Sequence, residues 1–226
     1  LETNVDIFNN KFLVGSFNTI TLGLFTGLIC ALLAIVINFS IRFTKNKFLE
    51  RLNSLMSIGY AIPGLILAVG ITRFLVFSDQ NVFTNINFVI TGSLVGLFLA
   101  YIIKSYALAN SSIESGYERI SNSIDNSAQL LGSSGGKLLG RIHFPLMRTS
   151  FLTAVLLVTS EVVKELPATL ILRPFNFDTL AVITYTYAAE ERMYQAALPS
   201  LAIVIIGIIP IIFLTKMIRS SRIKDL

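Results

Sequence analysis

A charged triplet interrupts one of the most apolar stretches of this sequence. Glu161, Lys164 and Glu165 are three and four residues apart, so a helix would place them on one face. Ionisable groups inside a membrane helix cost about 2.5–3.5 kcal/mol each, and they usually line a cavity or pair together. Pro167 follows and is expected to break the helix, which would free backbone carbonyl groups. Two carboxylates beside such a break would suit transient contact with a hard cation, because hard cations prefer oxygen ligands.

The same triplet has a structural interpretation. The charges can lie near the outer end of their helix, where they orient it or pair with a neighbouring helix. Arg73 is a candidate partner for Glu161 or Glu165. Alternatively, Arg73 and Lys104 both lie near the ends of apolar runs and can extend their charged groups to the membrane surface. Both interpretations remain open at this point.

Tyr60 and Pro63 lie in a second apolar run, where a proline favours a kink; ordinary packing is an equal alternative. With the Glu161–Pro167 group they are candidates for lining a pathway through a membrane. His143 is the only histidine and has no partner motif, so a metal role for it has little support. Beyond transient contacts to Glu161 and Glu165, the metal ligands are unknown and no catalytic residue is indicated.

The composition places these residues in a membrane protein. Apolar residues make up 54% of the 226 positions and charged residues 14%, with a mean hydropathy of +0.73. A soluble domain carries about 25% charged residues. The single Cys30 excludes an intrachain disulfide. The net charge of +5 resides in short clusters beside apolar runs, which is typical of a topology signal rather than of a nucleic-acid site.

Five segments are long enough to span a hydrocarbon core of about 30 Å as helices. They are Phe17–Ile41, Leu52–Phe77, Phe88–Ala109, Leu146–Leu172 and Leu198–Lys216. Gly23 and Gly27 form a Gly-x-x-x-Gly pair in the first segment, which favours close contact between helices. The first sixteen residues are polar and mixed, which is unlike a signal peptide. The start at Leu1 suggests a fragment or one half of a longer protein.

Positive residues are concentrated in alternate loops. Three clusters follow the first span, separate the third from the fourth, and close the chain: Arg42, Lys45, Lys47 and Arg51; Arg119, Lys137, Arg141 and Arg148; Lys216, Arg219, Arg222 and Lys224. The intervening loops hold only Lys11, Arg173 and Arg192. The positive-inside rule therefore predicts an outer N-terminus and a cytoplasmic C-terminus, which five spans also require.

A polar insert separates the third and fourth spans. Apolar residues recur at helical spacing over residues 112–131, with Ser112 as the expected cap and Gly132 just past the end. A second short helix can start at Ser133 or Ser134, and Pro145 suits the first turn of the next span. An ordinary amphipathic connector is the alternative interpretation.

Gly135, Gly136 and Lys137 look faintly like a phosphate-binding loop. That motif needs a glycine where Leu131 stands and a Ser or Thr where Leu138 stands, and no strand precedes it. The sequence therefore predicts no ATP site in this chain.

The insert resembles the cytoplasmic coupling loop of ATP-driven importer permeases, whose pattern is Glu-Ala-Ala, three residues, Gly, nine residues, Ile-x-Leu-Pro. The matching positions are Ala128, Gly132, Ile142 and Pro145; Ser127 replaces an alanine and Phe144 a leucine. Asn126 stands where the family has glutamate, with Asp125 one residue early. The resemblance implies that this loop docks on a separate ATPase, and Asn126 is expected to weaken a charge-based contact there.

Three further blocks look like the ferric-iron importer permeases: residues 59–70, 164–181 and 196–199. Residues 164–170 read Lys-Glu-Leu-Pro-Ala-Thr-Leu and are the most specific. The resemblance implies the second membrane half of a permease. Its implied partners are a cytoplasmic ABC ATPase dimer, a periplasmic substrate-binding protein, a second permease half and membrane lipid. Relatives carry thiamine, polyamines or phosphonates, which remain alternative substrates.

The expected fold is an all-α polytopic membrane bundle of about five spanning helices plus coupling helices, similar to type I ABC importer permeases. Residues 1–16 would be an outer lead-in, 17–216 one membrane domain with the coupling loop at 110–145, and 217–226 a cytoplasmic tail. The expected function is import of a solute, ferric iron first, across the bacterial inner membrane. ATP and magnesium would be used by the partner, with no cofactor on this chain. An ion-driven carrier or channel, a membrane-embedded enzyme and a structural scaffold are the rival interpretations.

Overall fold

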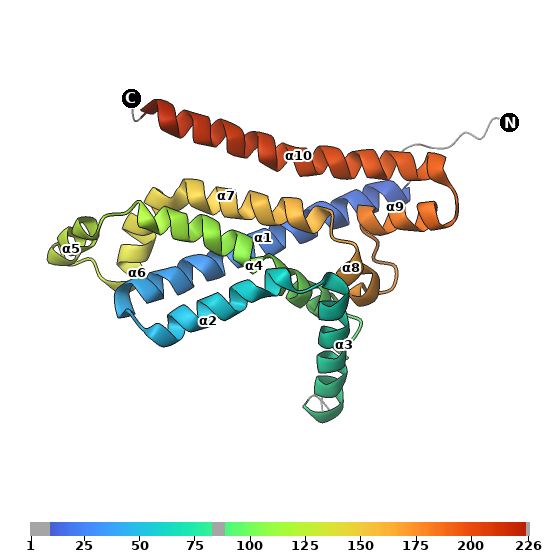
Figure 1. The fold of residues 1–226 in the computed structure, drawn as a ribbon, viewed down its shortest axis with the longest axis horizontal. Helices are drawn as coiled ribbons and strands as arrows, with labels where there is room; N and C mark the ends of the chain where they lie inside the picture. Colours follow the sequence, from blue (N-terminus) through green and yellow to red (C-terminus); the bar gives the residue numbers. More distant parts are fainter. Residues whose placement is uncertain (1–9, 83–88, 225–226) are drawn as a thin grey trace.

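A computed structural model describes residues 10–82 and 89–224, and within these ranges the chain forms helices and no strands. The predicted all-α fold is confirmed. Three long helices form the centre of the molecule, namely α1 (Asn10–Thr44), α4 (Leu94–Glu118) and α7 (Phe144–Val163). They lie side by side, and each packs against the other two (Figure 1).

Close packing of α1 on α7 depends on small residues. A Cβ atom added at Gly27 would lie 2.7 Å from the carbonyl oxygen of Val155, and one at Gly23 would lie 3.0 Å from Cγ2 of Thr159. The expectation of close helix contact at the Gly-x-x-x-Gly pair is therefore confirmed. Large side chains such as Tyr101 and Tyr106 then fill the space between α4 and its neighbours and are fully buried.

The predicted second span is wrong as a single continuous helix. The chain forms α2 (Lys47–Ile58), a 3-10 turn (Gly59–Ala61) and α3 (Gly64–Asn81), and the two parts are bent by 117°. Pro63 has no N–H to continue the helix, and it holds the preceding Ile62 in extended backbone with ψ 126°. The kink expected at Pro63 is thus a sharp break, beyond which α3 points away from the bundle (Figure 1).

The predicted fourth span is also interrupted. Helix α7 ends at Val163, Lys164 to Leu166 form a break, and α8 (Pro167–Leu172) begins with the proline in its first turn. The break expected from Pro167 is therefore confirmed, and the expected span Leu146–Leu172 consists of α7 followed by α8.

The first, third and fifth predicted spans are confirmed as long helices with shifted bounds. Four helices are long and apolar enough to cross a membrane, or five if the bent pair is one span: Asn10–Thr44, Leu94–Glu118, Gly135–Val163 and Met193–Phe213, plus the pair Lys47–Ala61 and Gly64–Asn81. Phe88, the expected start of the third span, lies outside the described residues. Helix α1 begins at Asn10, inside the expected lead-in, and α10 (Met193–Lys224) continues through most of the expected tail.

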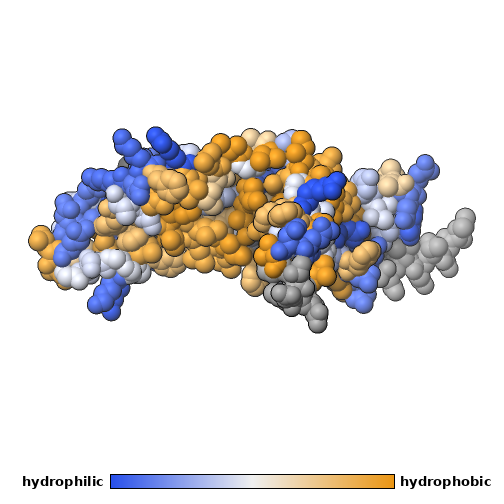
Figure 2. Space-filling view, turned by 90° about the horizontal axis from the view of Figure 1, so that it is seen from below, coloured by the Kyte–Doolittle hydropathy of each residue, from blue (hydrophilic) through white to orange (hydrophobic). Residues whose placement is uncertain are grey.

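One helix was not expected. Helix α9 (Leu180–Ala189) packs against α10, and α10 in turn packs along α7 (Figure 1). Apolar side chains cover much of the middle of the molecule, and hydrophilic ones gather toward its ends (Figure 2). The end of α1, the start of α2, the segment between α4 and α7, and the end of α10 all lie at one end of the long axis (Figure 1). The fold therefore brings the three basic clusters of the sequence to the same end.

Candidate coupling site on the α4–α7 connector

Residues 119–143, called here the α4–α7 connector, fold into α5 (Asn122–Leu130), α6 (Gly135–Leu138) and a π-helical turn (Leu139–His143). The predicted helix over residues 112–131 is wrong as one element, because α4 continues to Glu118 and α5 starts afresh at Asn122. Ser112 therefore lies inside α4 rather than capping a helix. The predicted second short helix is present as α6, with Ser134 as its N-cap residue.

Gly132 ends α5 in the conformation expected of it. Its φ of +80° is left-handed, which glycine adopts without the steric cost that other residues incur. The N–H of Ser133 donates to the carbonyl of Ala128, and the N–H of Gly132 donates to that of Gln129, each at 2.9 Å. These two bonds form a Schellman motif, which satisfies carbonyl groups that the helix end would leave free.

This turn presents two leucines to solvent at the tip of the connector. The side chains of Leu130 and Leu131 are 88% and 87% exposed. Leu130 ends α5 and Leu131 is its C-cap residue, so the pair forms a small apolar patch beside a polar helix and is a candidate contact surface. Asn126 and Ser127 also face outward, whereas Ala128 is buried against the rest of the protein.

The remaining predicted coupling residues lie where the connector joins α7. Ile142 is half-buried, Phe144 is 40% exposed and Pro145 is exposed. The N–H of Phe144 donates to the carbonyl of Leu139, five residues back. This wider π-helical turn directly precedes Pro145, whose missing N–H could not have continued a regular helical ladder. The second part of the connector, from Gly135 on, is therefore continuous with α7 and forms one helical piece from Gly135 to Val163.

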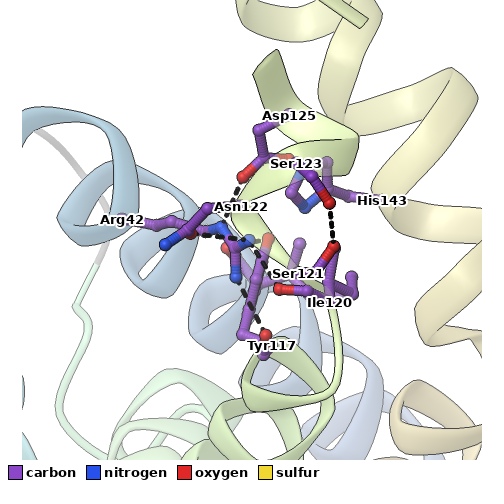
Figure 3. Close-up of polar contacts among 9 residues, drawn as sticks. Arg42, Tyr117, Ile120, Ser121, Asn122, Ser123, Asp125 and His143 are labelled. Atoms are coloured by element: carbon purple, nitrogen blue, oxygen red, sulfur yellow. Dashed lines mark hydrogen bonds and ion pairs between the residues drawn. The ribbon is translucent and has the colours of Figure 1, made fainter. Parts of the chain in front are cut away.

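A buried ionic cluster, which the sequence did not predict, holds α5 in place (Figure 3). Oδ2 of Asp125 accepts a hydrogen bond of 2.7 Å from Nε of Arg42 at the end of α1. The other carboxylate oxygen, Oδ1, lies 2.8 Å from Nε2 of His143. Asp125 therefore joins three separate parts of the chain: α1, α5 and the start of the α7 helix.

Arg42 also closes the end of α4. Its guanidinium donates to the carbonyl oxygens of Tyr117 at 2.9 Å and of Ile120 at 2.7 Å. The last carbonyl groups of a helix have no partner within it, and a cation there also interacts favourably with the helix dipole. Arg42 thus explains why α4 ends at this point and why α5 begins as a separate helix.

His143 is fully buried between aromatic rings. Its ring centroid lies 5.5 Å from those of Phe39 and Tyr117 and 6.0 Å from that of Phe43. Nδ1 has no hydrogen-bond partner in the part of the chain that the structure describes. A neutral ring with its proton on Nε2 fits this site, because that tautomer donates to Asp125 and leaves no buried N–H unpaired.

The two glutamates among the predicted pathway residues belong to separate ion pairs. Glu165 is 6% exposed, and its carboxylate forms an ion pair with Lys104 and accepts from the N–H of Ala168. Glu161 instead pairs with Lys164 at 2.9 Å. The predicted pairing of Arg73 with either glutamate is wrong, because the break before Pro167 turns Glu165 toward α4 and so toward Lys104.

Of the two further candidates, Tyr60 is half-exposed, whereas Pro63 lies beside one of these pairs. Pro63 forms the bend between α2 and α3, and a Cβ atom on the next residue, Gly64, would lie only 2.6 Å from Oε1 of Glu165. The two glutamates thus face different partners, and no group of three or more His, Cys, Asp or Glu side chains within residues 10–82 and 89–224 could hold a metal ion.

A cavity of about 600 Å³ opens at the other end of the bundle from the connector, between α3, the start of α4, and the loop after α8. Thr72, Ser93 and Arg173 are among its lining residues. Asp178, in the same lining, forms ion pairs with Arg173 and with Lys11, the latter at 3.7 Å. The cavity walls are therefore polar on the loop side.

Sequence reasoning treated Arg42 only as a topology charge and Asp125 only as a misplaced glutamate. One signal could have identified their role. Asp125 is three residues before Ala128, so both lie on one face of α5, and an acid on the buried face of a helix needs a partner. The partner itself, 83 positions away, could not be identified without the fold.

Comparisons with known proteins agree with this architecture. The chain is 25% identical over 210 residues to the Fe(3+)-transport system permease protein FbpB 2 of Haemophilus influenzae, which covers 92% of this chain and 38% of that protein. It is also 25% identical over 204 residues to the putative 2-aminoethylphosphonate transport system permease protein PhnV of Salmonella typhimurium, covering 90% and 73%. No family model matches the chain.

Two solved structures share the fold. The inward-facing MetNI methionine ABC transporter aligns with a TM-score of 0.67 and 13% identity over 91% of this chain and 95% of that one. A bacterial ABC transporter for import of the polysaccharide alginate aligns with a TM-score of 0.67 and 16% identity, over 98% and 84%. The chain has the helical fold of ABC importer permeases and is similar in sequence to an Fe(3+)-transport permease and to a putative 2-aminoethylphosphonate permease.

Proposed function

We propose that this chain is a transmembrane permease domain of an ATP-driven importer. It receives solute from a binding protein on the outer side and passes it through the membrane when a separate ATPase closes on the inner side. The chain itself catalyses no covalent step, and ATP and magnesium are bound by the partner. This role is supported by the two relatives, an Fe(3+)-transport system permease protein and a putative 2-aminoethylphosphonate transport system permease protein.

The observation that carries the proposal is the leucine tip of the α4–α7 connector. Leu130 and Leu131 project from the Schellman turn. The helix behind them, α5, is attached to the bundle by the buried Arg42–Asp125 ion pair and by the Asp125–His143 hydrogen bond. A docking surface that transmits force needs both features, an exposed apolar contact and a stiff attachment. Docking at this tip suits the cytoplasmic face, where the positive-inside rule places the three basic clusters.

The proposed substrate is ferric iron. The support is the resemblance to the Fe(3+)-transport permease, and the chain spans 38% of that protein. The match to PhnV, a putative 2-aminoethylphosphonate permease, favours a phosphonate as the second candidate. Glu161 and Glu165 are each paired with a lysine, so contact with a bare cation would require these ion pairs to open.

Capture of the ATPase tests the docking role. The wild-type chain, purified in detergent from its own cells, is expected to retain an ABC ATPase. Replacing both leucines by serine (Leu130→Ser with Leu131→Ser) is expected to lose it, because the exposed contact is removed while nothing buried changes. Leu55→Ser is the matched control, since Leu55 is an exposed leucine on α2. Equal retention by all three proteins would contradict docking at the connector tip.

Uptake by the reconstituted assembly tests the substrate. Proteoliposomes containing the permease, its copurifying ATPase and its binding protein are supplied with radiolabelled ferric iron or 2-aminoethylphosphonate. ATP-dependent accumulation of iron supports the proposal, whereas accumulation of the phosphonate alone transfers the assignment to that substrate. Uptake that is unaffected by ATP would favour an ion-driven carrier or channel instead.

A further inference from the structure

The ionic cluster on the connector joins separate helical segments of the chain, and its geometry does not suit binding of a ligand. Arg42, Asp125 and His143 come from α1, α5 and the start of the α7 helix, and their side chains are 16%, 8% and 0% exposed. Each oxygen of the Asp125 carboxylate contacts a different element. A small molecule could not reach the cluster without displacing one of them.

Few other contacts hold α5 in place. Only Asp125 and Ala128 of its nine residues are buried, and Ser121 before it makes no side-chain capping bond. Apolar burial therefore does little to fix this helix, and its position depends on the two bonds of Asp125 and on a longer one, of 3.3 Å, from Arg42 to Oδ1 of Asn122. Arg42 adds a second attachment, because the same guanidinium that binds Asp125 also holds the carbonyls of Tyr117 and Ile120 where α4 ends.

The bonds to Asp125 also require its charge. An asparagine in its place has one acceptor oxygen and one NH₂ donor, so it can accept from Arg42 or from His143 but not from both. With its oxygen on Arg42, its NH₂ group would face Nε2 of His143, which could accept only if the ring proton moved to Nδ1, an atom without a hydrogen-bond partner among the described residues. Asp125→Asn is therefore a nearly isosteric change that weakens the cluster without removing a packing contact of the bundle.

We propose that Arg42, Asp125 and His143 are positioning residues that fix α5 to α1, α4 and α7, so that the leucine tip and the membrane helices move as one body. This inference rests on the proposed function, because it assigns the cluster a part in transmitting motion between the ATPase and the permease. The three residues touch neither solute nor nucleotide. Without these residues the tip would still dock on the ATPase. Its movement would then shift α5 alone and would not be passed to the membrane helices.

The first experiment measures the position of α5 without any partner. Spin labels are attached at Leu130→Cys and Val36→Cys, both exposed positions, in a Cys30→Ala background, and the distance distribution between them is recorded in detergent. The distribution is expected to be narrow with the native cluster and several-fold broader in Asp125→Asn. Asp79→Asn is the matched control. Asp79 lies on α3, accepts hydrogen bonds from the N–H groups of Ile90 and Thr91, and does not contact α5. A distribution that stays narrow in Asp125→Asn would overturn the proposal.

The second experiment measures coupling in the reconstituted complex. In Asp125→Asn we expect a lower thermal stability, because Arg42 loses its buried carboxylate, and the assembled complex that remains should retain the ATPase but lose several-fold in solute transported per ATP hydrolysed. A cluster that only stabilised the fold would lower the amount of active complex and leave that ratio unchanged. The double variant Arg42→Gln with Asp125→Asn is expected to be no worse than the more impaired single variant, since both changes break the same link. Additive losses would overturn the assignment.

The two experiments separate this inference from the function on which it rests. Failure of the wild-type chain to retain an ATPase would contradict the proposed function, while the spin-label distances would still decide whether the cluster fixes α5. A retained ATPase with an unchanged transport-to-hydrolysis ratio in Asp125→Asn would contradict the inference and leave the permease assignment intact.

Discussion

The Lys104–Glu165 ion pair shows how a residue suggested by the sequence takes a different role in the fold. Glu165 was a candidate to contact a passing cation, but its carboxylate is buried at the break before α8 and is neutralised by a lysine from α4. The surrounding hydroxyls add to the site: Tyr101 donates to Thr169 at 2.6 Å, and Thr169 donates to the carbonyl of Glu165 at 2.7 Å. The break in the helix is therefore held by a polar network that joins α4 to α8.

Removing one partner of this pair is expected to cost far more than removing both. Lys104→Ala leaves a buried carboxylate without its cation, and we expect a loss of about 3–5 kcal/mol in stability. Lys104→Met with Glu165→Gln removes both charges and is expected to remain close to wild type. Thermal unfolding in detergent measures both. Lys164→Ala is the control, because the Lys164 side chain is 62% exposed and its pair with Glu161 contributes about 0–1 kcal/mol. Equal losses in Lys104→Ala and Lys164→Ala would contradict this account.

Gly132 is expected to stabilise the end of α5 because of its backbone conformation and not because a larger side chain would lack space. A Cβ atom there would meet nothing within 4 Å, but φ is +80°, and an L-residue in that region costs roughly 1–2 kcal/mol. Gly132→Ala should therefore speed hydrogen exchange of the α5 amides several-fold, because the helix end opens more often. Gly136→Ala is the control, since that site is equally open but its φ is not positive. Slower or unchanged exchange in Gly132→Ala would show that the turn does not stabilise α5.

At the scale of elements, hydropathy predicted the long helices but not their breaks. A membrane helix is recognised because about 20 consecutive apolar residues are needed to cross the hydrocarbon, and that criterion identified α1, α4, α7 and α10. It cannot detect an angle, so the run through Pro63 was taken as one span although the chain bends by 117°. The ten-residue α9 was too short to be recognised.

The connector, too, has features that the sequence could predict and features that it could not. Its turn at Gly132 and its start at Ser134 could be predicted, because glycine and serine have local preferences at helix ends. The division between α4 and α5 could not, since it depends on Arg42, which is 75 positions away from the Tyr117 carbonyl that it binds. Contacts between distant residues follow from the packing of α1 on α4, which no local pattern in the sequence encodes.

The contact between α1 and α7 gives a test at this scale. Gly27→Ala places a methyl group 2.7 Å from a backbone oxygen of α7, which cannot yield as a side-chain tip could. Overpacking of this kind typically costs about 1–3 kcal/mol, so we expect a lower Tm in detergent. Gly70→Ala adds the same methyl group on α3 where nothing lies within 4 Å, and it should not lower the Tm. A Tm for Gly27→Ala equal to that of Gly70→Ala would mean that α1 and α7 do not approach this closely.

At the scale of the whole molecule, the two ends of the bundle carry different features: an exposed apolar tip at one end and a polar cavity at the other. The connector with its leucine tip lies at one end, with the end of α1 and the end of α10 (Figure 1). The polar cavity lies toward the other end, bordered by the loop of residues 173–178 between α8 and α9. The three basic clusters lie in the segments at the connector end. The alternation of charge along the sequence therefore becomes a difference in charge between the two ends of the bundle.

This asymmetry predicts which end faces the cytoplasm. Leu130 and Phe175 are 88% and 102% exposed and belong to the two opposite ends, so a cysteine at either position should react with a membrane-impermeant maleimide from one side only. We expect Leu130→Cys to react in inverted vesicles and Phe175→Cys in spheroplasts, because basic segments are retained on the cytoplasmic side. Cys30 is fully buried and serves as the internal control that should react from neither side. Reaction of both introduced cysteines from the same side would contradict the spanning arrangement, and the reverse pattern would place the leucine tip outside, where no ATPase could reach it.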